Sequence, residues 1–134
     1  PEQRLWRHVL LNAVEDTRIT QSDRKSSICK MEAHDWITKE NKDFTWICWQ
    51  SGWDPEVVKE QYFKAVRKGN IVFTKRQIKW VEYYKLYLDL KNEKDVEKRQ
   101  KLRKQVDSLR KKVLNTTTAV VKMFIVEQNL VPCG

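Results

Sequence analysis

Apolar residues recur at helical spacing over the first part of the chain, and this pattern predicts two amphipathic helices. The first is expected from about Glu2 to Asp16, where a polar stretch interrupts the pattern. Ser22 or Asp23 can cap a second helix that runs to about Lys39. The residues expected to face a core are Leu5, Trp6, Val9, Leu10, Ala13 and Val14 in the first helix, and Cys29, Ala33, Trp36 and Ile37 in the second.

The stretch from Asp43 to Val66 predicts two further helices that meet at a tight turn. Asp43 is expected to cap the first of them, and Gly52 suits the left-handed residue that ends it. Asp54 followed by Pro55 then starts the second helix. Apolar residues that can form a shared core are Phe44, Ile47, Cys48, Val58, Tyr62 and Val66. The sequence therefore predicts a helix-turn-helix unit, and the alternative is an ordinary helical hairpin.

The first of these two helices also carries tryptophans on a second face, so most of its circumference is apolar. Three interpretations are open. The C-terminal helices can cover this face, it can bind a protein partner, or bases of a single strand can stack on it. The residues concerned are Trp46, Trp49 and Trp53.

A fifth helix is expected to begin at about Lys75, because Thr74 and Gln77 have the spacing of a capping box. It carries one stripe of Ile78, Val81, Tyr84 and Leu88 and a second aromatic stripe of Trp80, Tyr83 and Tyr87. The aromatic stripe is a second candidate surface for a protein partner.

Leu102, Val106, Leu109 and Val113 form a heptad seam, and the same register reaches Val120 and Met123. The segment can fold back on the fifth helix with a bend near residues 92–95, or it can pair with another copy of the chain. The predicted fold is all-α, with a helix-turn-helix domain over residues 1–69 and a basic helical hairpin or coiled coil over residues 70–134.

Composition agrees with this fold class. The 134 residues include 3 Gly and 3 Pro, too few for a turn-rich β-sandwich. No apolar run approaches membrane-spanning length, and the N-terminus lacks the apolar core of a signal peptide, so no membrane association and a cytoplasmic location are expected. Cys29, Cys48 and Cys133 lack metal-ligand spacing and are interpreted as buried or inert thiols.

No catalytic motif, cofactor loop or metal site is recognised, so the protein is predicted not to be an enzyme and to need no cofactor or metal. His34 is interpreted as a surface histidine on a helix rather than a general base.

Net charge changes the picture more than any motif does. The chain has 27 Lys and Arg against 18 Asp and Glu, a formal charge of +9, which is typical of a protein that binds a polyanion. Residues 91–112 hold ten basic and four acidic side chains. This tract is interpreted either as a solvated helix face or as a surface for phosphates. Its candidate residues are Lys98, Arg99, Lys101, Arg103, Lys104, Arg110, Lys111 and Lys112.

The pattern F-x-x-I-C-x-x-S-G-x-D-P from Phe44 to Pro55, with the core residues of the two preceding helices, resembles small helix-turn-helix regulators of tailed phages and prophage-like elements. The resemblance covers about half of the chain. It implies duplex DNA binding by the helix that begins at Pro55. On this interpretation Lys59, Lys64, Arg67 and Lys68 face phosphates and Gln61 can read a base edge.

A second, local pattern runs from Phe73 to Tyr84. Thr74, Gln77, Val81 and Tyr84 resemble the opening of phage small terminase subunits, where this motif starts the DNA-binding domain. In that family an Asn-Ala-rich helix follows, whereas this chain continues LKNEKDVEKRQ. The resemblance implies a packaging subunit that assembles as a ring.

The leading functional hypothesis from the sequence is a non-enzymatic, phage-type regulator of transcription that binds duplex DNA. One alternative is a factor, such as an antiterminator, that binds RNA polymerase through the aromatic faces. Another is a small terminase-like packaging subunit, which predicts a homo-oligomer.

Overall fold

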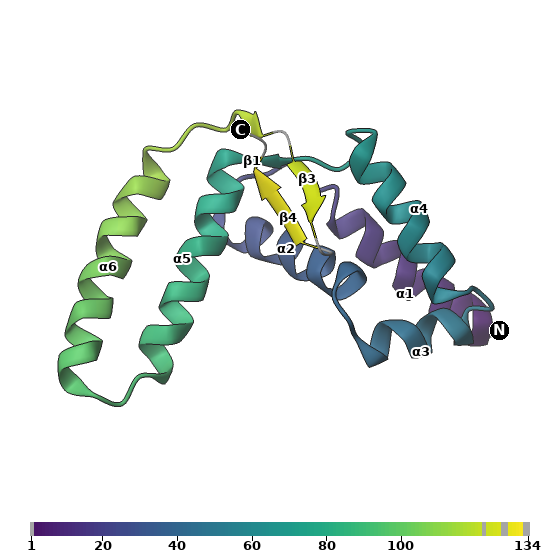
Figure 1. Ribbon diagram of the computed structural model, residues 1–134, viewed down its shortest axis with the longest axis horizontal. Helices are drawn as coiled ribbons and strands as arrows, with labels where there is room; N and C mark the ends of the chain where they lie inside the picture. Colours follow the sequence, from purple (N-terminus) through teal and green to yellow (C-terminus); the bar gives the residue numbers. More distant parts are fainter. Residues whose placement is uncertain (1, 122, 127–128, 133–134) are drawn as a thin grey trace. The chain divides into compact units, whose positions relative to one another are not determined.

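Helices form most of the computed structural model, which describes residues 2–121, 123–126 and 129–132 (Figure 1). The all-α prediction is therefore confirmed in its broad form. Two short strand pairs, β1 with β2 and β3 with β4, are present in addition. The elements in chain order are α1 (Glu2–Asp16), α2 (Arg24–Thr38), α3 (Lys42–Gln50), α4 (Pro55–Arg67), β1 (Phe73–Thr74), α5 (Lys75–Asn92), α6 (Val96–Leu114), β2 (Val120–Val121), β3 (Met123–Val126) and β4 (Asn129–Pro132).

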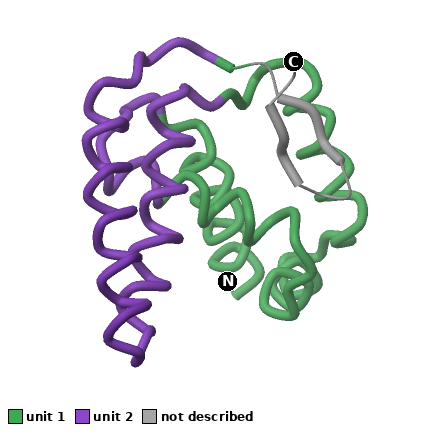
Figure 2. Tube along the Cα trace, turned by 60° about the vertical axis from the view of Figure 1, so that its left-hand side comes forward, with its two compact units in different colours: residues 1–19, 29–72, 121–134 green, residues 20–28, 73–120 purple. Residues whose placement is uncertain are grey.

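The chain forms two compact units, which Figure 2 shows in different colours. Unit 1 comprises residues 1–19, 29–72 and 121–134, and unit 2 comprises residues 20–28 and 73–120. Neither unit is therefore one continuous segment of chain. The domain boundary predicted after residue 69 lies close to the crossing after residue 72, and the other crossings have no counterpart in the predicted division.

In unit 1, the turn between α3 and α4 follows from local sequence signals. The backbone N–H of Ser51 donates to the carbonyl of Ile47 and ends α3. Gly52 then adopts a φ of +79°, in the left-handed region that glycine tolerates best. The Asp54 carboxylate accepts the N–H of Glu56 at 2.9 Å, so α4 starts with a capped first turn. The predicted turn between two helices is thus confirmed.

The predicted cap of α3 was wrong by two residues. Asn41, not Asp43, is the N-cap, and its side-chain oxygen accepts the backbone N–H groups of Asp43 at 2.9 Å and of Phe44 at 3.3 Å. Asn41 has the extended backbone of a cap, with φ −148° and ψ 119°. Asp43 instead lies in the first turn, where its charge favours the helix N-terminus.

The core of unit 1 draws one or two apolar side chains from each helix. The rings of Trp36 and Phe44 meet edge to face at 5.3 Å. The side chain of Arg7 joins α1 to the end of α3, because its Nε donates to the carbonyl of Ser51 at 2.9 Å. The buried apolar residues of unit 1 include Leu10, Ile37, Phe44, Cys48, Tyr62, Val66 and Ile71.

His34 was predicted to lie on the surface, and this is wrong: its exposed fraction is 2%. Its Nδ1 lies 2.7 Å from the Tyr62 hydroxyl of α4, which gives the buried imidazole a hydrogen-bonding partner. Burial lowers the pKa of His34 to about 4, with Asp35 opposing and Lys39 adding to the shift. Burial also raises the pKa of Tyr62, so its hydroxyl stays protonated at neutral pH.

Lys30 of α2 is also buried, and its Nζ donates to two backbone carbonyls of unit 1. One is the carbonyl of Ile19, at 2.7 Å, and the other is that of Val72. Burial lowers the pKa of Lys30 to about 8, so the group remains mostly charged at pH 7. Ile19 and Val72 are the last residues of unit 1 before the chain continues into unit 2. The Lys30 ammonium group therefore holds both points at which the chain leaves unit 1.

In unit 2, α5 begins with the predicted capping box. The N–H of Gln77 donates to the Thr74 hydroxyl at 3.1 Å, and the Gln77 side-chain oxygen accepts the N–H of Thr74 at 2.9 Å. Gln77 is buried and its amide nitrogen also donates to the carbonyl of Gln21 at 2.9 Å. The same side chain therefore caps α5 and holds the segment before α2.

The predicted heptad seam closes within the chain, because α6 folds back along α5 (Figure 1). Val106 and Val113 are buried with Tyr83 and Leu90 of α5. Partly buried side chains complete the cluster, namely Trp80, Leu86, Tyr87, Leu102 and Leu109. Of the two alternatives for the seam, the structure contains the hairpin, with its bend at residues 93–95.

The sequence pattern predicted that the seam continues to Val120 and Met123, and this is wrong. α6 ends at Leu114, with Asn115 as C-cap, and the Thr116 hydroxyl donates to the carbonyl of Lys112 at 2.7 Å. Three consecutive threonines follow Asn115, and β-branched residues of this kind favour extended backbone over helix. Val120 accordingly lies in β2 and Met123 begins β3, which pairs antiparallel with β4.

The burial of His34 makes the stability of the protein depend on pH. The folded pKa is about 4 and the unfolded value is 6.5, so the unfolded state binds more protons between these values. Stability from this group is complete above about pH 6.5 and is lost as the pH falls towards 4. We expect the loss to reach at most about 3 kcal/mol. Between pH 7 and pH 5 the expected loss is about 2 kcal/mol, and urea denaturation at these two pH values measures it.

The matched pair for this test is His34→Gln and His8→Gln, since His8 is exposed. The first variant should show a smaller drop in unfolding free energy between pH 7 and pH 5 than the wild-type protein, and the second should keep the wild-type drop. Equal drops in all three proteins would mean that folding does not lower the pKa of His34.

Candidate nucleic-acid interface

The net positive charge of the chain lies in one unit. Unit 2 has 16 Lys and Arg against 7 Asp and Glu, whereas unit 1 has 11 of each. The whole formal charge of +9 therefore belongs to unit 2. A polyanionic partner is attracted to a local excess of charge rather than to the average, so unit 2 is the electrostatic candidate for the interface.

All eight basic residues predicted on α6 are exposed. The helix repeats about every 3.6 residues, so each can be placed relative to the buried seam. Arg99, Arg103 and Arg110 lie along one flank of the seam. The lysines occupy the other flank and the side away from α5, and these are Lys98, Lys101, Lys104, Lys111 and Lys112.

No ion pair found among the described residues neutralises these cations. Among the described residues, the ion pairs are Arg18 with Glu15, Lys39 with Asp35, Arg67 with Glu60 and Lys79 with Glu82. None of these pairs involves α6. Arg99 does donate from Nη1 to the carbonyl of Glu93 at 3.2 Å, but that contact leaves its charge uncompensated. The exposed cations of α6 are therefore available to an external anion.

The predicted recognition helix, α4, has a more mixed surface. Lys64 and Lys68 are exposed, as is Gln61, but Glu56 and Glu60 are exposed on the same helix. Arg67 lies 3.5 Å from the Glu60 carboxylate, which partly offsets its charge. Lys59 is half-buried, with its Nζ 5.7 Å from the centre of the Phe44 ring, so it belongs partly to the core of unit 1.

The tryptophans predicted for partner binding differ in exposure. Trp46 is 51% exposed and Trp49 is 59% exposed, so both present large apolar rings at the surface of α3. Trp46 also meets the Trp6 ring of α1 edge to face at 5.0 Å. Trp53 is half-buried, and the Arg7 guanidinium lies 5.1 Å from its ring.

The aromatic stripe of α5 contributes to the hairpin core. Tyr83 is 5% exposed, and Trp80 and Tyr87 pack against the same cluster. Its rings are close neighbours, at 5.4 Å from Trp80 to Tyr83 and 6.3 Å from Tyr83 to Tyr87. The burial of Tyr83 against α6 leaves this residue unavailable to a partner while the hairpin is closed.

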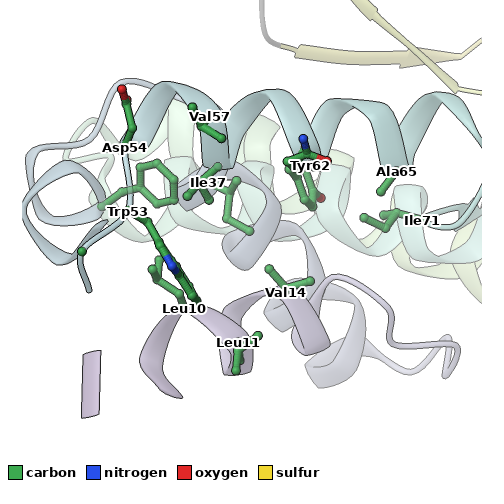
Figure 3. A pocket seen from close by; sticks show the side chains of 14 residues that line it. Leu10, Leu11, Val14, Ile37, Trp53, Asp54, Val57, Tyr62, Ala65 and Ile71 are labelled. Atoms are coloured by element: carbon green, nitrogen blue, oxygen red, sulfur yellow. The ribbon is translucent and has the colours of Figure 1, made fainter. Parts of the chain in front are cut away.

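Unit 1 contains an apolar pocket of about 510 Å³ between α1 and α4, which the sequence did not indicate (Figure 3). In Figure 3, Leu10 and Val14 of α1 lie across from Tyr62 and Ala65 of α4. The rim includes Leu11, which is 54% exposed. A pocket of this size is within the range that holds small molecules, and its walls offer water few hydrogen-bonding partners.

Cys29 is half-buried and Cys48 is buried. Burial raises the pKa of the Cys48 thiol to about 11, with a smaller opposing effect of Lys59, so the thiol is protonated and unreactive. Cys133 lies outside the described residues. Within residues that the structure describes, no cluster of His, Cys, Asp and Glu could hold a metal ion. No helix there has the length and apolar character needed to cross a membrane.

Comparison with known proteins finds no matching family model, no matching curated protein and no matching solved structure. The resemblances to phage regulators and to small terminase subunits therefore remain predictions.

Filling the apolar pocket of unit 1 should stabilise the protein. Ala65 lines the pocket on α4, and Ala65→Leu would add apolar atoms to the empty space. We expect the free energy of unfolding to rise by about 1 kcal/mol, measured by urea denaturation. Lys64→Leu, on the exposed side of the same helix, adds a similar side chain without entering the pocket and should not stabilise. A loss of stability in Ala65→Leu would indicate that the pocket is too narrow for the added atoms.

Proposed function

We propose that this protein binds duplex DNA through phosphate contacts from α6. The observation that carries the proposal is that all eight basic side chains of α6 are exposed, and none of them is in an ion pair found among the described residues. Lys and Arg that are free of acidic partners release counterions from DNA when they bind phosphates, and this release supplies sequence-independent affinity.

The hairpin suits such contacts for a second reason. The seam with α5 holds the backbone of α6, so its charged side chains extend from a fixed helix. The arginines on one flank are spaced by 4 and 7 residues, about 6 and 10.5 Å along the axis at 1.5 Å per residue. Their planar guanidinium groups can make paired hydrogen bonds to phosphate oxygens.

Within this proposal, α3 and α4 act as a helix-turn-helix that adds base contacts. The specific observations in favour are the tight turn at Gly52 and the exposure of Gln61 and Lys64 on α4. The acidic residues Glu56 and Glu60 make α4 a weak source of phosphate affinity. We therefore assign affinity to α6 and sequence reading to α4, in a transcription regulator of the type that the phage resemblance implies.

A second candidate function is binding to a protein such as RNA polymerase. The exposed rings of Trp46 and Trp49 favour it, because clustered exposed aromatic side chains are typical of protein interfaces. An antiterminator of this kind would bind DNA weakly and retain polymerase subunits strongly. A terminase-like ring is a further candidate, although the seam of α6 is already occupied by α5 of the same chain.

The test is fluorescence anisotropy of a labelled random-sequence duplex titrated with the protein at several salt concentrations between about 50 and 200 mM. We expect affinity to fall steeply with salt. The triple variant Arg99→Gln, Arg103→Gln, Arg110→Gln should lower the slope of log affinity against log salt by about 3, since each lost phosphate contact removes about one unit. Circular dichroism verifies that the variant keeps its helices.

The matched control removes three charges from α4 instead, as Lys64→Gln, Arg67→Gln, Lys68→Gln. This variant should keep the wild-type salt slope on a random duplex. The reverse result, a loss of slope in the α4 variant alone, would move the phosphate contacts to α4. Absence of binding at low salt would refute direct DNA binding and make the tryptophan surface the leading explanation.

A further inference from the structure

Unit 2 contains a second pocket, of about 640 Å³, that differs in chemistry from the apolar pocket of unit 1. It lies among the segment before α2, the start of α5 and the end of α6. Two arginines, Arg24 and Arg76, line it together with the indole of Trp80, several hydroxyl groups and one carboxylate. No basic residue of α6 lines this pocket, so it is separate from the proposed phosphate-binding face.

The guanidinium of Arg76 is held by the end of α6. Its Nε donates to the carbonyl of Thr116 at 3.0 Å, and its Nη2 donates to the carbonyl of Leu114 at 3.4 Å. A guanidinium has five N–H donors, so three are left after these two contacts. The two carbonyls orient the group without cancelling its charge.

The guanidinium of Arg24 is held in a different way, with the same consequence. Its central carbon lies 5.1 Å from the ring centre of Tyr83 and 5.4 Å from that of Tyr87. Cation–π contacts of this kind fix a cation without using an acceptor atom. The N–H donors of Arg24 are therefore available to a ligand, and arginines positioned in this way are suited to paired hydrogen bonds with a phosphate.

Trp80 gives the pocket an aromatic wall. Its ring meets Tyr83 edge to face at 5.4 Å and remains half-exposed, so it is positioned by the hairpin core and still lines the pocket. Leu114, which is also exposed, adds apolar surface. The hydroxyls of Thr20 and Thr118 supply uncharged polar groups. A half-exposed indole next to arginines is the combination on which a nucleobase stacks.

The charged residues that line the pocket favour an anion. Asp23 is the one carboxylate among the lining residues, and it accepts the N–H of Ser26 at 3.1 Å as the cap of α2. Two arginines against one carboxylate leave the lining with a net positive charge, which favours an anionic ligand. We propose that this pocket binds a nucleoside monophosphate, free or at the end of a nucleic-acid strand, with its phosphate on Arg24 and its base on Trp80.

Isothermal titration calorimetry of the full chain with AMP, GMP, CMP and UMP tests the proposal, with inorganic phosphate as reference. We expect at least one nucleotide to bind about tenfold or more tightly than inorganic phosphate, because base stacking adds to the phosphate contacts. Arg24→Gln should weaken that binding about tenfold or more, since it removes charge-assisted hydrogen bonds. Lys25→Gln removes the same charge from the next residue, which is exposed and does not line the pocket, and should leave nucleotide affinity unchanged.

Strand ends and free nucleotides are distinguished by a single-stranded oligonucleotide with and without a 5′-phosphate. If the phosphorylated strand displaces the bound mononucleotide and the unphosphorylated strand does not, the ligand is a strand end. If neither strand displaces it, the ligand is the free nucleotide. Either result supports the pocket. Nucleotide binding no tighter than that of phosphate, or equal losses in Arg24→Gln and Lys25→Gln, would overturn it.

This outcome is independent of the proposed DNA binding. The α6 triple variant loses duplex affinity if the DNA proposal holds, whereas Arg24→Gln loses mononucleotide affinity if the pocket proposal holds. Failure of one proposal therefore leaves the other measurable in the same protein.

Discussion

The apolar contact between α5 and α6 is the interaction on which unit 2, the unit with the net positive charge, depends. α6 carries eight basic and two acidic residues, and like charges on neighbouring turns of an isolated helix repel one another. Val106 and Val113 are buried against Tyr83 and Leu90, and this burial offsets the repulsion. Every basic side chain is then directed away from the seam. Hydrophobic packing on one side of α6 thus creates the basic surface on its other sides.

Unit 1 is built on a different balance. Its basic and acidic residues are equal in number, and it buries several polar groups together with its apolar core. His34 contacts Tyr62, and Lys30 donates to two carbonyls. Among the described residues, no buried side-chain nitrogen or oxygen lacks a hydrogen-bonding partner. Satisfied contacts of this kind limit the cost of burying polar groups and favour one arrangement of the helices.

The two pockets differ because the two units differ in the residues that line them. Where α1 and α4 of unit 1 meet, the walls are almost entirely apolar, so shape and hydrophobicity would select any occupant. Unit 2 places Arg24 and Arg76 beside Trp80, so its pocket is suited to an anion with an aromatic group. A hairpin that contacts phosphates along α6 and holds a nucleotide where α5 starts and α6 ends would combine two ways of binding nucleic acid in one unit.

The sequence by itself determined most of the helices, because their signals lie within a few residues of one another. The capping box at Thr74, the turn at Gly52 and the heptad seam of α6 were all predicted and are all present. Where two local signals competed, the sequence was less informative. Asn41 caps α3 in place of Asp43, and the threonines after Asn115 end α6 before its apolar register does.

Only the tertiary structure decided which polar residues are buried and which aromatic rings an arginine contacts. His34 contacts a tyrosine 28 positions further along the chain, and Arg24 stacks on aromatic rings of α5 that no periodic pattern links to it. The assembly of each unit from separate segments of the chain likewise depends on contacts between residues far apart in the sequence. Hydrophobic period and capping are local properties of a chain, whereas the partner of a buried polar group depends on how the helices pack, and that was visible only in three dimensions.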